Sequence, residues 1–313
     1  MRRDSFEQKQ QAAAWLDPIV EVDPGTRVFE EYLKLTKPRI TLLILISTAV
    51  GYCFGAGSHL DTFTLLNALL GTTLLAAGAA TLNQWYERDI DSKMNRTRTR
   101  PIPAGTIEAR HALYFGVALS LLGAIDLWSF TNSLAAALGL LTSFAYLFAY
   151  TPLKRRTPLC TTIGAVPGAI PPLIGFAAAS GHLNLDAWIL FGILFLWQFP
   201  HFHAIAWMYR EDYKRGDIKM LAVVEPDGKA LSRQIIVTLL LLIPVTLAPA
   251  FVHMAGKVYF VAAFLLGLGL LYFGVQICMQ RTYARARLLL LASVIYMPLL
   301  FAFLVFDNPK FTL

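Results

Sequence analysis

Nine apolar segments limit the folds open to this chain more than any other feature. Each is long enough, or nearly so, for the roughly 20 residues that a helix needs to cross the hydrocarbon core of a membrane. Backbone groups find no water inside a bilayer, so such segments form helices with internal hydrogen bonds. We therefore predict an all-α, polytopic membrane protein with nine transmembrane helices around a central cavity that opens to the cytoplasmic side. The segments are Ile40–Gly57, Leu65–Trp85, Ala112–Trp128, Ser133–Tyr150, Leu159–Ala179, Ala187–Met208, Ile235–His253, Val258–Ile277 and Leu288–Phe306.

The basic residues predict how the chain is oriented. Of the 27 Lys and Arg residues, 25 lie in the amino-terminal stretch or in the loops after the second, fourth, sixth and eighth segments. An excess of Lys and Arg marks cytoplasmic loops, so we predict a bacterial plasma (inner) membrane with a cytoplasmic amino terminus and an outward carboxyl terminus. The lipid bilayer accounts for the net charge of +7, and no nucleic-acid partner is needed to explain it.

Composition divides the chain into two parts. Residues 1–36 mix acidic and basic side chains and lack the apolar region of a signal peptide. We predict that they form a cytoplasmic leader, with an interfacial helix near residues 27–37. Residues 37–313 form the predicted membrane domain. Its three cysteines have no paired spacing, so neither a disulfide nor a metal cluster is expected.

Three oxygen-bearing residues follow one another at four-residue intervals at the end of the second segment. Asn83, Glu87 and Asp91 drift by only about 40° per step on a helix, so they share one face, whereas Asp89 points elsewhere. Magnesium commonly binds through one or two carboxylates together with phosphate oxygens. We predict that these three residues hold Mg²⁺. A charged helix end at the headgroup level is the alternative interpretation.

Basic residues concentrate beside this row. Arginines suit a diphosphate because its oxygens accept bidentate guanidinium contacts, although each basic residue alone also fits a role in membrane orientation. The loop after the sixth segment adds Asp212 as a candidate ligand of a second Mg²⁺, with Glu211 and Asp217 as weaker candidates. The basic candidates at the same depth are Lys37, Arg39, Arg96, Arg98, Arg100, Lys154 and Arg155.

These motifs resemble those of the UbiA-type intramembrane prenyltransferases. Asn83, Glu87 and Asp91, followed by Arg96 and Arg100, are similar to the first aspartate-rich motif in the form found among the protohaem IX farnesyltransferases of that family. Four residues after Asp212, where the wider family usually carries a second aspartate, this chain has glycine. Further similar stretches are Leu35–Arg39, Tyr150–Pro158, Ile163–Pro172 and Trp197–Phe202.

The resemblance implies a reaction, its substrates and a set of residue roles. A member of this group would join farnesyl diphosphate to a vinyl group of haem b, with addition of water, to give haem O and diphosphate. A haem A synthase would be a partner by pathway alone. The resemblance implies that Asn83, Glu87, Asp91 and Asp212 are catalytic metal ligands and that Lys37, Arg96, Arg100, Lys154 and Arg155 bind diphosphate.

Two histidines in the sixth segment are candidates for contact with the acceptor. Ionisable groups are costly within a membrane span, so they suggest a function. His201 and His203 differ by about 200° on an ideal helix and do not face one cavity. We favour His201, which lies in the matching Pro-His-Phe stretch, as a haem-iron ligand or as a propionate or general-base partner. A histidine hydrogen-bonded between two helices is the alternative, and His111 is a second candidate.

Three other functions compete with this reading. An aromatic quinone precursor as the acceptor would keep the enzyme class, but Glu87 and the Pro-His-Phe stretch argue against it. A transporter would carry polar residues through the middle of several spans, whereas here they gather at one membrane face. A structural assembly factor with a vestigial site is hard to reconcile with the intact row of three ligands.

Overall fold

Helices account for nearly all of the regular structure in residues 24–309, which are the residues described by the computed structural model. Nine helical stretches in this part of the chain are long and apolar enough to cross a membrane, as predicted, so the chain is a multi-pass membrane protein. They are α3 (Pro38–Ala56), α4 (Thr62–Asp91), α5 (Ala109–Phe130), α6 continuing to Leu153 (Ser133–Leu153), α8 with α9 (Cys160–Ser180), α10 (Leu185–Met208), α13 (Lys229–Phe251), α14 (Lys257–Met279) and α15 (Tyr283–Phe306).

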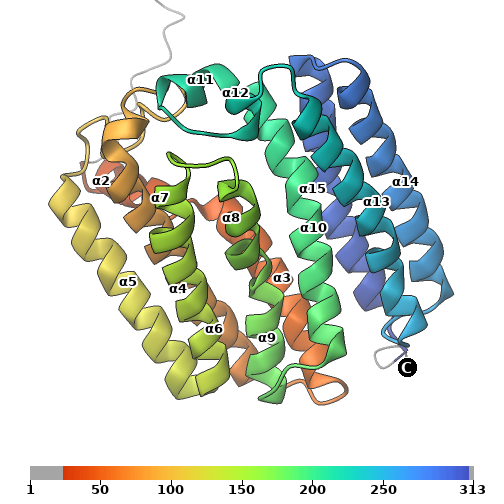
Figure 1. Ribbon diagram of the computed structural model, residues 1–313. Coiled ribbons are helices and arrows are strands. Elements are labelled where there is room, and N and C mark those ends of the chain that lie inside the picture. Colours follow the sequence, from red (N-terminus) through yellow and green to blue (C-terminus); the bar gives the residue numbers. More distant parts are fainter. Residues whose placement is uncertain (1–23, 310–313) are drawn as a thin grey trace, which may run out of the picture.

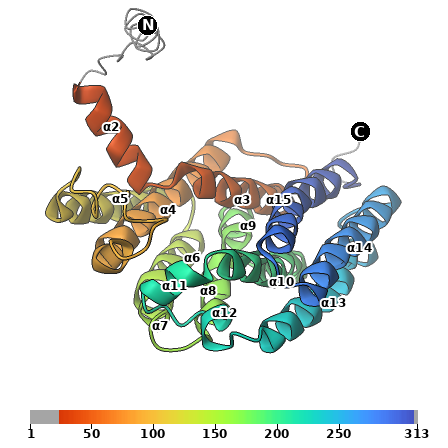
Figure 2. The ribbon, with the colours of Figure 1, turned by 90° about the horizontal axis from the view of Figure 1, so that it is seen from above.

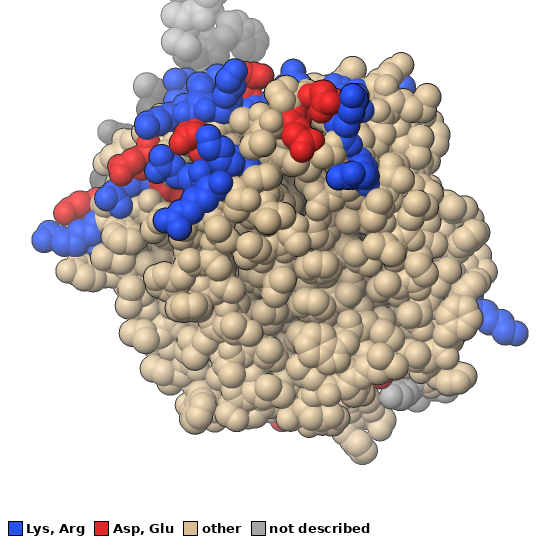
Figure 3. Space-filling model, in the orientation of Figure 1, with Lys and Arg blue, Asp and Glu red and all other residues tan. Residues whose placement is uncertain are grey.

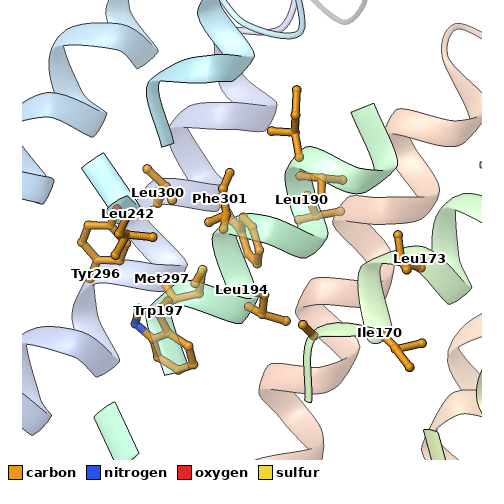
Figure 4. Close-up of a cluster of buried hydrophobic side chains, with 14 of the residues drawn as sticks. Ile170, Leu173, Leu190, Leu194, Trp197, Leu242, Tyr296, Met297, Leu300 and Phe301 are labelled. Atoms are coloured by element: carbon orange, nitrogen blue, oxygen red, sulfur yellow. The ribbon is translucent and has the colours of Figure 1, made fainter. Parts of the chain in front are cut away.

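The spans stand side by side, with α10 in a central position (Figure 1). Helix α10 contacts α13 and α15 on one side and α8, α9 and α3 on the other. Helices α5 and α14 lie at opposite edges of the bundle when it is seen from above (Figure 2). The centre between α9, α10 and α15 is filled by apolar side chains such as Leu173, Leu190, Leu194 and Phe301 (Figure 4). The opening of a cavity to the cytoplasmic side stays a prediction.

The fifth span is broken at Ile170 into α8 (Cys160–Ala169) and α9 (Pro171–Ser180). The broken span packs closely on its neighbours through glycines. A Cβ atom on Gly175 would lie 1.9 Å from the carbonyl oxygen of Thr48 in α3, and one on Gly168 would lie 2.0 Å from Oε1 of Gln198 in α10. Small residues at such contacts let membrane helices approach closely, so these glycines allow the broken span to pack tightly against α3 and α10.

The fourth span changes its winding near its end. Helix α6 (Ser133–Phe144) passes into a π-helical turn, η1 (Ala145–Tyr150), and ends in α7 (Thr151–Leu153). Such turns widen a helix by one residue and are frequent at functional sites. This π-helical turn was not predicted from the sequence.

Charged residues gather at one end of the bundle, which we call the charged end (Figure 3). The long connections 92–108 and 209–228 lie there, the second with the short helices α11 (Arg210–Arg215) and α12 (Leu221–Val224). Helix α2 (Pro24–Leu35) also lies at this end and covers most of the predicted interfacial helix. Its contact with a membrane surface and the division at residue 36 stay predictions, and residues 1–23 of the leader lie outside the described part.

Candidate active site

The last three turns of α4 bring Asn83, Glu87 and Asp91 onto one face of the helix, as their spacing predicts. All three side chains are buried, with exposed fractions of 1%, 6% and 0%. Asp89 projects away from them: its side chain is 86% exposed and lies 3.9 Å from Arg88. The helix therefore separates one solvated carboxylate from a row of three buried oxygen-bearing groups, which we call the α4 row.

Each member of the α4 row is contacted by a cation from a different segment. Lys37 Nζ donates to Asn83 Oδ1 at 3.3 Å, and Lys154 Nζ donates to Glu87 Oε1 at 2.8 Å. Arg100 donates through Nη1 to Asp91 Oδ2 at 2.6 Å. The structure thus brings together six of the residues predicted from sequence, and positive and negative groups alternate at the charged end of the bundle.

Hydrogen bonds from the neighbouring segments hold this arrangement in place. Gln84 Nε2 donates to the carbonyl oxygen of Leu35 at 2.8 Å and so fixes the turn between α2 and α3. In that turn Lys37 has the left-handed φ of 50°. On the other side, Asn83 Nδ2 donates to Thr151 Oγ1 at 3.2 Å, which leaves the amide oxygen directed at Lys37.

The lysines differ in their electrostatic surroundings. Burial lowers the pKa of Lys37 to about 7, and the nearby cations of Arg100 and Lys154 act in the same direction. Burial also disfavours the charge of Lys154, but the Glu87 carboxylate outweighs burial and raises the pKa of Lys154 above its usual value. An anion bound between these cations would favour the charged form of Lys37, because a nearby opposite charge stabilises it.

One oxygen of the α4 row has no partner. Asp91 Oδ1 is buried and accepts no hydrogen bond in the described part of the chain, although Oδ2 is paired with Arg100. A buried acceptor without a donor is unfavourable, so a ligand that supplies positive charge at this oxygen would be stabilising. Two carboxylates and an amide form a hard-oxygen donor set, which suits Mg²⁺ completed by phosphate and water oxygens. Within residues 24–309 no group of three His, Cys, Asp or Glu side chains could hold a metal ion. A metal at the α4 row would therefore also need the Asn83 amide and oxygens from phosphate or water.

Asp212 lies 7% exposed in α11 and holds the loop that follows α4. Its carboxylate accepts from the backbone N–H groups of Asn95 at 3.0 Å and Arg96 at 3.3 Å, and it is paired with Arg215. Burial alone would raise the pKa of Asp212, but the Arg215 contact and the two N–H donors hold it below its usual value. The connection after α10 therefore holds the connection after α4 in place. Whether Asp212 also contacts metal stays a prediction.

The missing second aspartate of this loop has a steric explanation. Gly216 packs against the first loop, and a Cβ atom there would lie 3.0 Å from the sulfur of Met94 and 3.1 Å from Ile90. A carboxylate at this position would have to displace Met94. The next residue, Asp217, is exposed and is paired with Lys219 at 2.9 Å and Arg155 at 3.5 Å. The close contact between the connections after α10 and α4 therefore occupies the space that the side chain of a second aspartate would need.

The other predicted residues lie on the rim of the site. The Arg96 guanidinium stacks over the rings of Tyr209 at 4.8 Å and Tyr213 at 5.4 Å. Arg155 is exposed beside Asp217, and Glu211 is exposed beside Arg210. None of these five charged side chains makes a hydrogen bond or ion pair with the α4 row in the described structure.

Two tyrosines of the π-helical turn, Tyr146 and Tyr150, border the site, and Tyr146 is not among the residues predicted from the sequence. Tyr146 lies close enough to Glu87, Asp91 and Lys154 to interact with them electrostatically. The Tyr150 ring lies 4.5 Å from Lys154 Nζ, within the range of a cation–π contact. The spacing of these aromatic residues just before Pro152 was visible in the sequence, but only the altered winding of η1 shows that both belong to the site.

The two histidines of α10 face different helices. His201 Nδ1 lies 2.9 Å from Ser293 Oγ in α15, whereas His203 Nε2 lies 2.9 Å from Gln234 Oε1 in α13. This agrees with their predicted angular separation. His201 also stacks on Trp197, with ring centroids 4.8 Å apart. His111 is exposed beside Glu108 at the start of α5.

Within residues 24–309, nine apolar spans carry at one end a row of buried oxygen-bearing groups paired with cations, an arrangement that suits the binding of an anionic group beside the membrane interior. The chain belongs to the UbiA prenyltransferase family, whose sequence profile matches residues 44–305. It is accordingly a prenyltransferase.

Individual curated proteins are similar to the chain along most of its length. The chain is 52% identical to the protoheme IX farnesyltransferase of Solibacter usitatus over 288 residues, which cover 89% of this chain and 99% of that protein. It is 44% identical to the protoheme IX farnesyltransferase of Koribacter versatilis over 302 residues, which cover 93% and 97%.

Solved structures share the fold at low sequence identity. A digeranylgeranylglyceryl phosphate synthase superposes with a TM-score of 0.75 at 18% identity, covering 91% of this chain and 99% of its own. A UbiA homologue from Archaeoglobus fulgidus, bound to GPP and Mg²⁺, superposes with a TM-score of 0.64 at 19% identity, covering 88% and 99%. These likenesses confirm the predicted helical fold.

Proposed function

We propose that this chain transfers the farnesyl group of farnesyl diphosphate to a vinyl group of haem b, with addition of water, to give haem O and diphosphate. The observation that carries the proposal is the α4 row, in which Asn83, Glu87 and Asp91 each meet a cation. The choice of acceptor draws on the relatives named protoheme IX farnesyltransferase. This acceptor is favoured over a quinone precursor for the same reason.

The reaction balances without an oxidant. The bond between the allylic carbon and the diphosphate oxygen breaks, and the electron pair leaves with diphosphate. The allylic carbon bonds to the terminal carbon of the vinyl group, and the positive charge passes to the carbon next to the porphyrin ring. Water adds to that carbon and loses a proton, which gives the hydroxyethylfarnesyl side chain.

The proposed metal ligands are Asn83, Glu87 and Asp91, with Asp212 as a further ligand. The unpartnered Asp91 Oδ1 supports this assignment, because that buried oxygen is available for coordination. When bound, Mg²⁺ would supply positive charge that stabilises the departing diphosphate. For Asp212, coordination would compete with the two backbone N–H groups that it accepts from.

The cations have two proposed positions relative to the diphosphate. Lys37, Arg100 and Lys154 are within hydrogen-bonding distance of the α4 row and would bind the diphosphate directly. Arg96 and Arg155 lie on the rim and would contact it on entry or release. Preorganised cations lower the barrier because they stabilise charge that grows as the leaving group departs.

We also propose in which membrane the chain lies, how it is oriented there and which enzyme uses its product. The basic residues of the charged end favour the cytoplasmic face of a bacterial plasma membrane, with the carboxyl terminus outside. Farnesyl diphosphate would then reach the site from the cytoplasm with its chain in the lipid. A haem A synthase would be a functional partner, because its reaction consumes haem O.

The decisive experiment is mass analysis of acid-extracted haem from the membranes of a host that lacks its own haem O synthase. Expression of this chain should yield a species heavier than haem b by farnesyl plus water. Asp91→Ala should abolish that species, whereas Asp89→Asn, which alters the exposed carboxylate two residues away, should leave it. Recovery of haem b alone from folded wild-type protein would refute the acceptor and direct attention to prenylated quinone precursors.

A further inference from the structure

The side chain of Asn83 differs from the two carboxylates of the α4 row because its two ends are chemically different. The amide oxygen can bind a metal ion, whereas the NH₂ group can only donate hydrogen bonds. A half-turn about the last side-chain bond would exchange the two ends with almost no change in shape. A ligand set that includes the Asn83 oxygen therefore needs a neighbour that fixes the orientation of this amide.

The hydroxyl of Thr151 is such a neighbour, because its hydrogen is already used. Thr151 Oγ1 donates to the carbonyl oxygen of Tyr146 at 2.8 Å. A hydroxyl has a single hydrogen, so toward Asn83 Nδ2, at 3.2 Å, the Thr151 oxygen can only accept. The nitrogen of the amide must then face Thr151. The amide oxygen must face the other side, where Lys37 Nζ donates to it at 3.3 Å.

We infer that Thr151 is a positioning residue that holds the Asn83 amide with its oxygen toward the proposed metal site. The inference rests on the proposed function and deepens it, because it concerns a metal ligand assigned there. The Thr151 and Asn83 residues are 2% and 1% exposed, so water cannot replace the hydroxyl as the acceptor. Loss of the hydroxyl would leave a buried NH₂ group without this partner, and the amide would gain by turning.

The π-helical turn η1 explains why the Thr151 hydrogen points away from Asn83. The carbonyl oxygen of Tyr146 accepts from the backbone N–H of Thr151, five residues later, which is the spacing of a π-helix. The same oxygen also accepts from the Thr151 hydroxyl. Just beyond the turn, Thr151 and Lys154 both reach the α4 row, at Asn83 and Glu87. The altered winding therefore supports the orientation of a proposed ligand.

Two other buried amides in the spans are oriented in a different way. Gln84 Nε2 donates to the carbonyl oxygen of Leu35 at 2.8 Å, and Gln198 Nε2 donates to two backbone carbonyl oxygens at 3.1 Å. Backbone acceptors hold both amides, and a side-chain substitution does not remove a backbone acceptor. Asn83 instead depends on the Thr151 hydroxyl, so one substitution at Thr151 should release its amide.

The test is the Mg²⁺ requirement for binding farnesyl thiolodiphosphate, an unreactive analogue of the proposed donor, to purified full-length protein in detergent. Equilibrium dialysis at a fixed, low analogue concentration gives the Mg²⁺ concentration for half-maximal binding. Thr151→Val keeps the shape but removes the hydroxyl, and it should raise this concentration about 10-fold, as loss of a supporting hydrogen bond does at metal sites. Thr151→Ser keeps the hydroxyl and should restore the wild-type value. Thr151→Ala serves the same purpose if Thr151→Val does not fold.

Two further variants separate orientation from general damage. Asn83→Asp replaces the amide by a carboxylate, whose two oxygens are equivalent and need no orientation. In the Asn83→Asp background, Thr151→Val should therefore cause no further rise in the Mg²⁺ requirement. The matched control is Thr81→Val, which removes a hydroxyl from a residue that is 0% exposed and that donates to the carbonyl oxygen of Ala77 at 2.8 Å. Thr81→Val should leave the Mg²⁺ requirement unchanged.

The outcomes distinguish this inference from the proposed function. An unchanged Mg²⁺ requirement in Thr151→Val, or a rise of the same size in the Asn83→Asp background, would overturn the inference. The proposed function would stand in either case if the wild type makes haem O. Failure of the wild type both to bind the analogue and to make haem O would instead remove the proposed function.

Discussion

Removing the charge of Glu87 tests whether the α4 row is a coupled electrostatic unit. The Glu87 and Lys154 side chains are 8% and 10% exposed, and their charged atoms lie 2.8 Å apart. Glu87→Gln keeps the shape of the side chain but leaves the Lys154 ammonium buried without its counter-charge. Breaking a buried pair in this way typically destabilises a protein by about 3–5 kcal/mol, because the remaining charge loses its compensation.

The assay is a double-mutant cycle on unfolding in detergent. Glu87→Gln and Lys154→Met are measured singly and together, since the combined variant removes both buried charges. We expect each single variant to lower the free energy of unfolding by about 3–5 kcal/mol and the double variant to recover most of that loss. All three should lack prenyl transfer, because the proposed metal ligand, the proposed diphosphate contact or both are removed.

The control lies at the same helix end. Asp89→Asn alters a carboxylate that is 86% exposed and 3.9 Å from Arg88, and exposed pairs of this kind contribute little. Stability and activity should therefore match the wild type. Additive losses in the Glu87 and Lys154 cycle would refute the reasoning, because they would mean that the two charges do not depend on each other.

Three further predictions follow from the structure. Gly175→Ala should strongly destabilise the protein, because the added Cβ atom would lie 1.9 Å from the carbonyl oxygen of Thr48. Gly269→Ala should be tolerated, because its Cβ atom would meet nothing within 4 Å. Thermal unfolding of the two variants measures the difference. Asp212→Asn should loosen the loop after α4, seen as faster amide hydrogen exchange at residues 95–96, and raise the KM for farnesyl diphosphate. Lys37 has a folded pKa of about 7 against 10.5 when unperturbed, so its unfavourable burial is fully present below pH 7 and relieved as pH rises toward 10.5. Lys37→Met should therefore stabilise the protein at pH 7 more than at pH 10, as measured by unfolding at both values.

The sequence predicted those parts of the fold that depend on composition and local spacing. Nine spans follow from the length of the apolar segments, because a bilayer admits only structures that satisfy their own backbone groups. The shared face of Asn83, Glu87 and Asp91 follows from 3.6 residues per turn. Both properties belong to single helices, so they can be deduced without knowing how the helices pack.

Partner choices could not be deduced in the same way. That Lys154 pairs with Glu87, and Arg100 with Asp91, depends on how α4 meets two other segments. Asp212 was expected only as a metal ligand, yet its carboxylate accepts from the backbone of a loop more than 100 residues earlier in the chain. The π-helical turn that places Tyr146 near the site has no local signature. Such contacts depend on how distant segments pack together, which the spacing of residues along a single helix does not show.

The depths of the two candidate sites agree with a single reaction centre. Asn83 lies eight residues before the last residue of α4, and His201 lies seven before the last residue of α10. Both helices end at the charged end of the bundle (Figure 1). At 1.5 Å per residue, both side chains start about 10–12 Å below their helix ends. A diphosphate held at the α4 row and an iron held at His201 would then lie in the same half of the membrane. The farnesyl chain and the porphyrin ring could meet in apolar surroundings without either polar group leaving its own site.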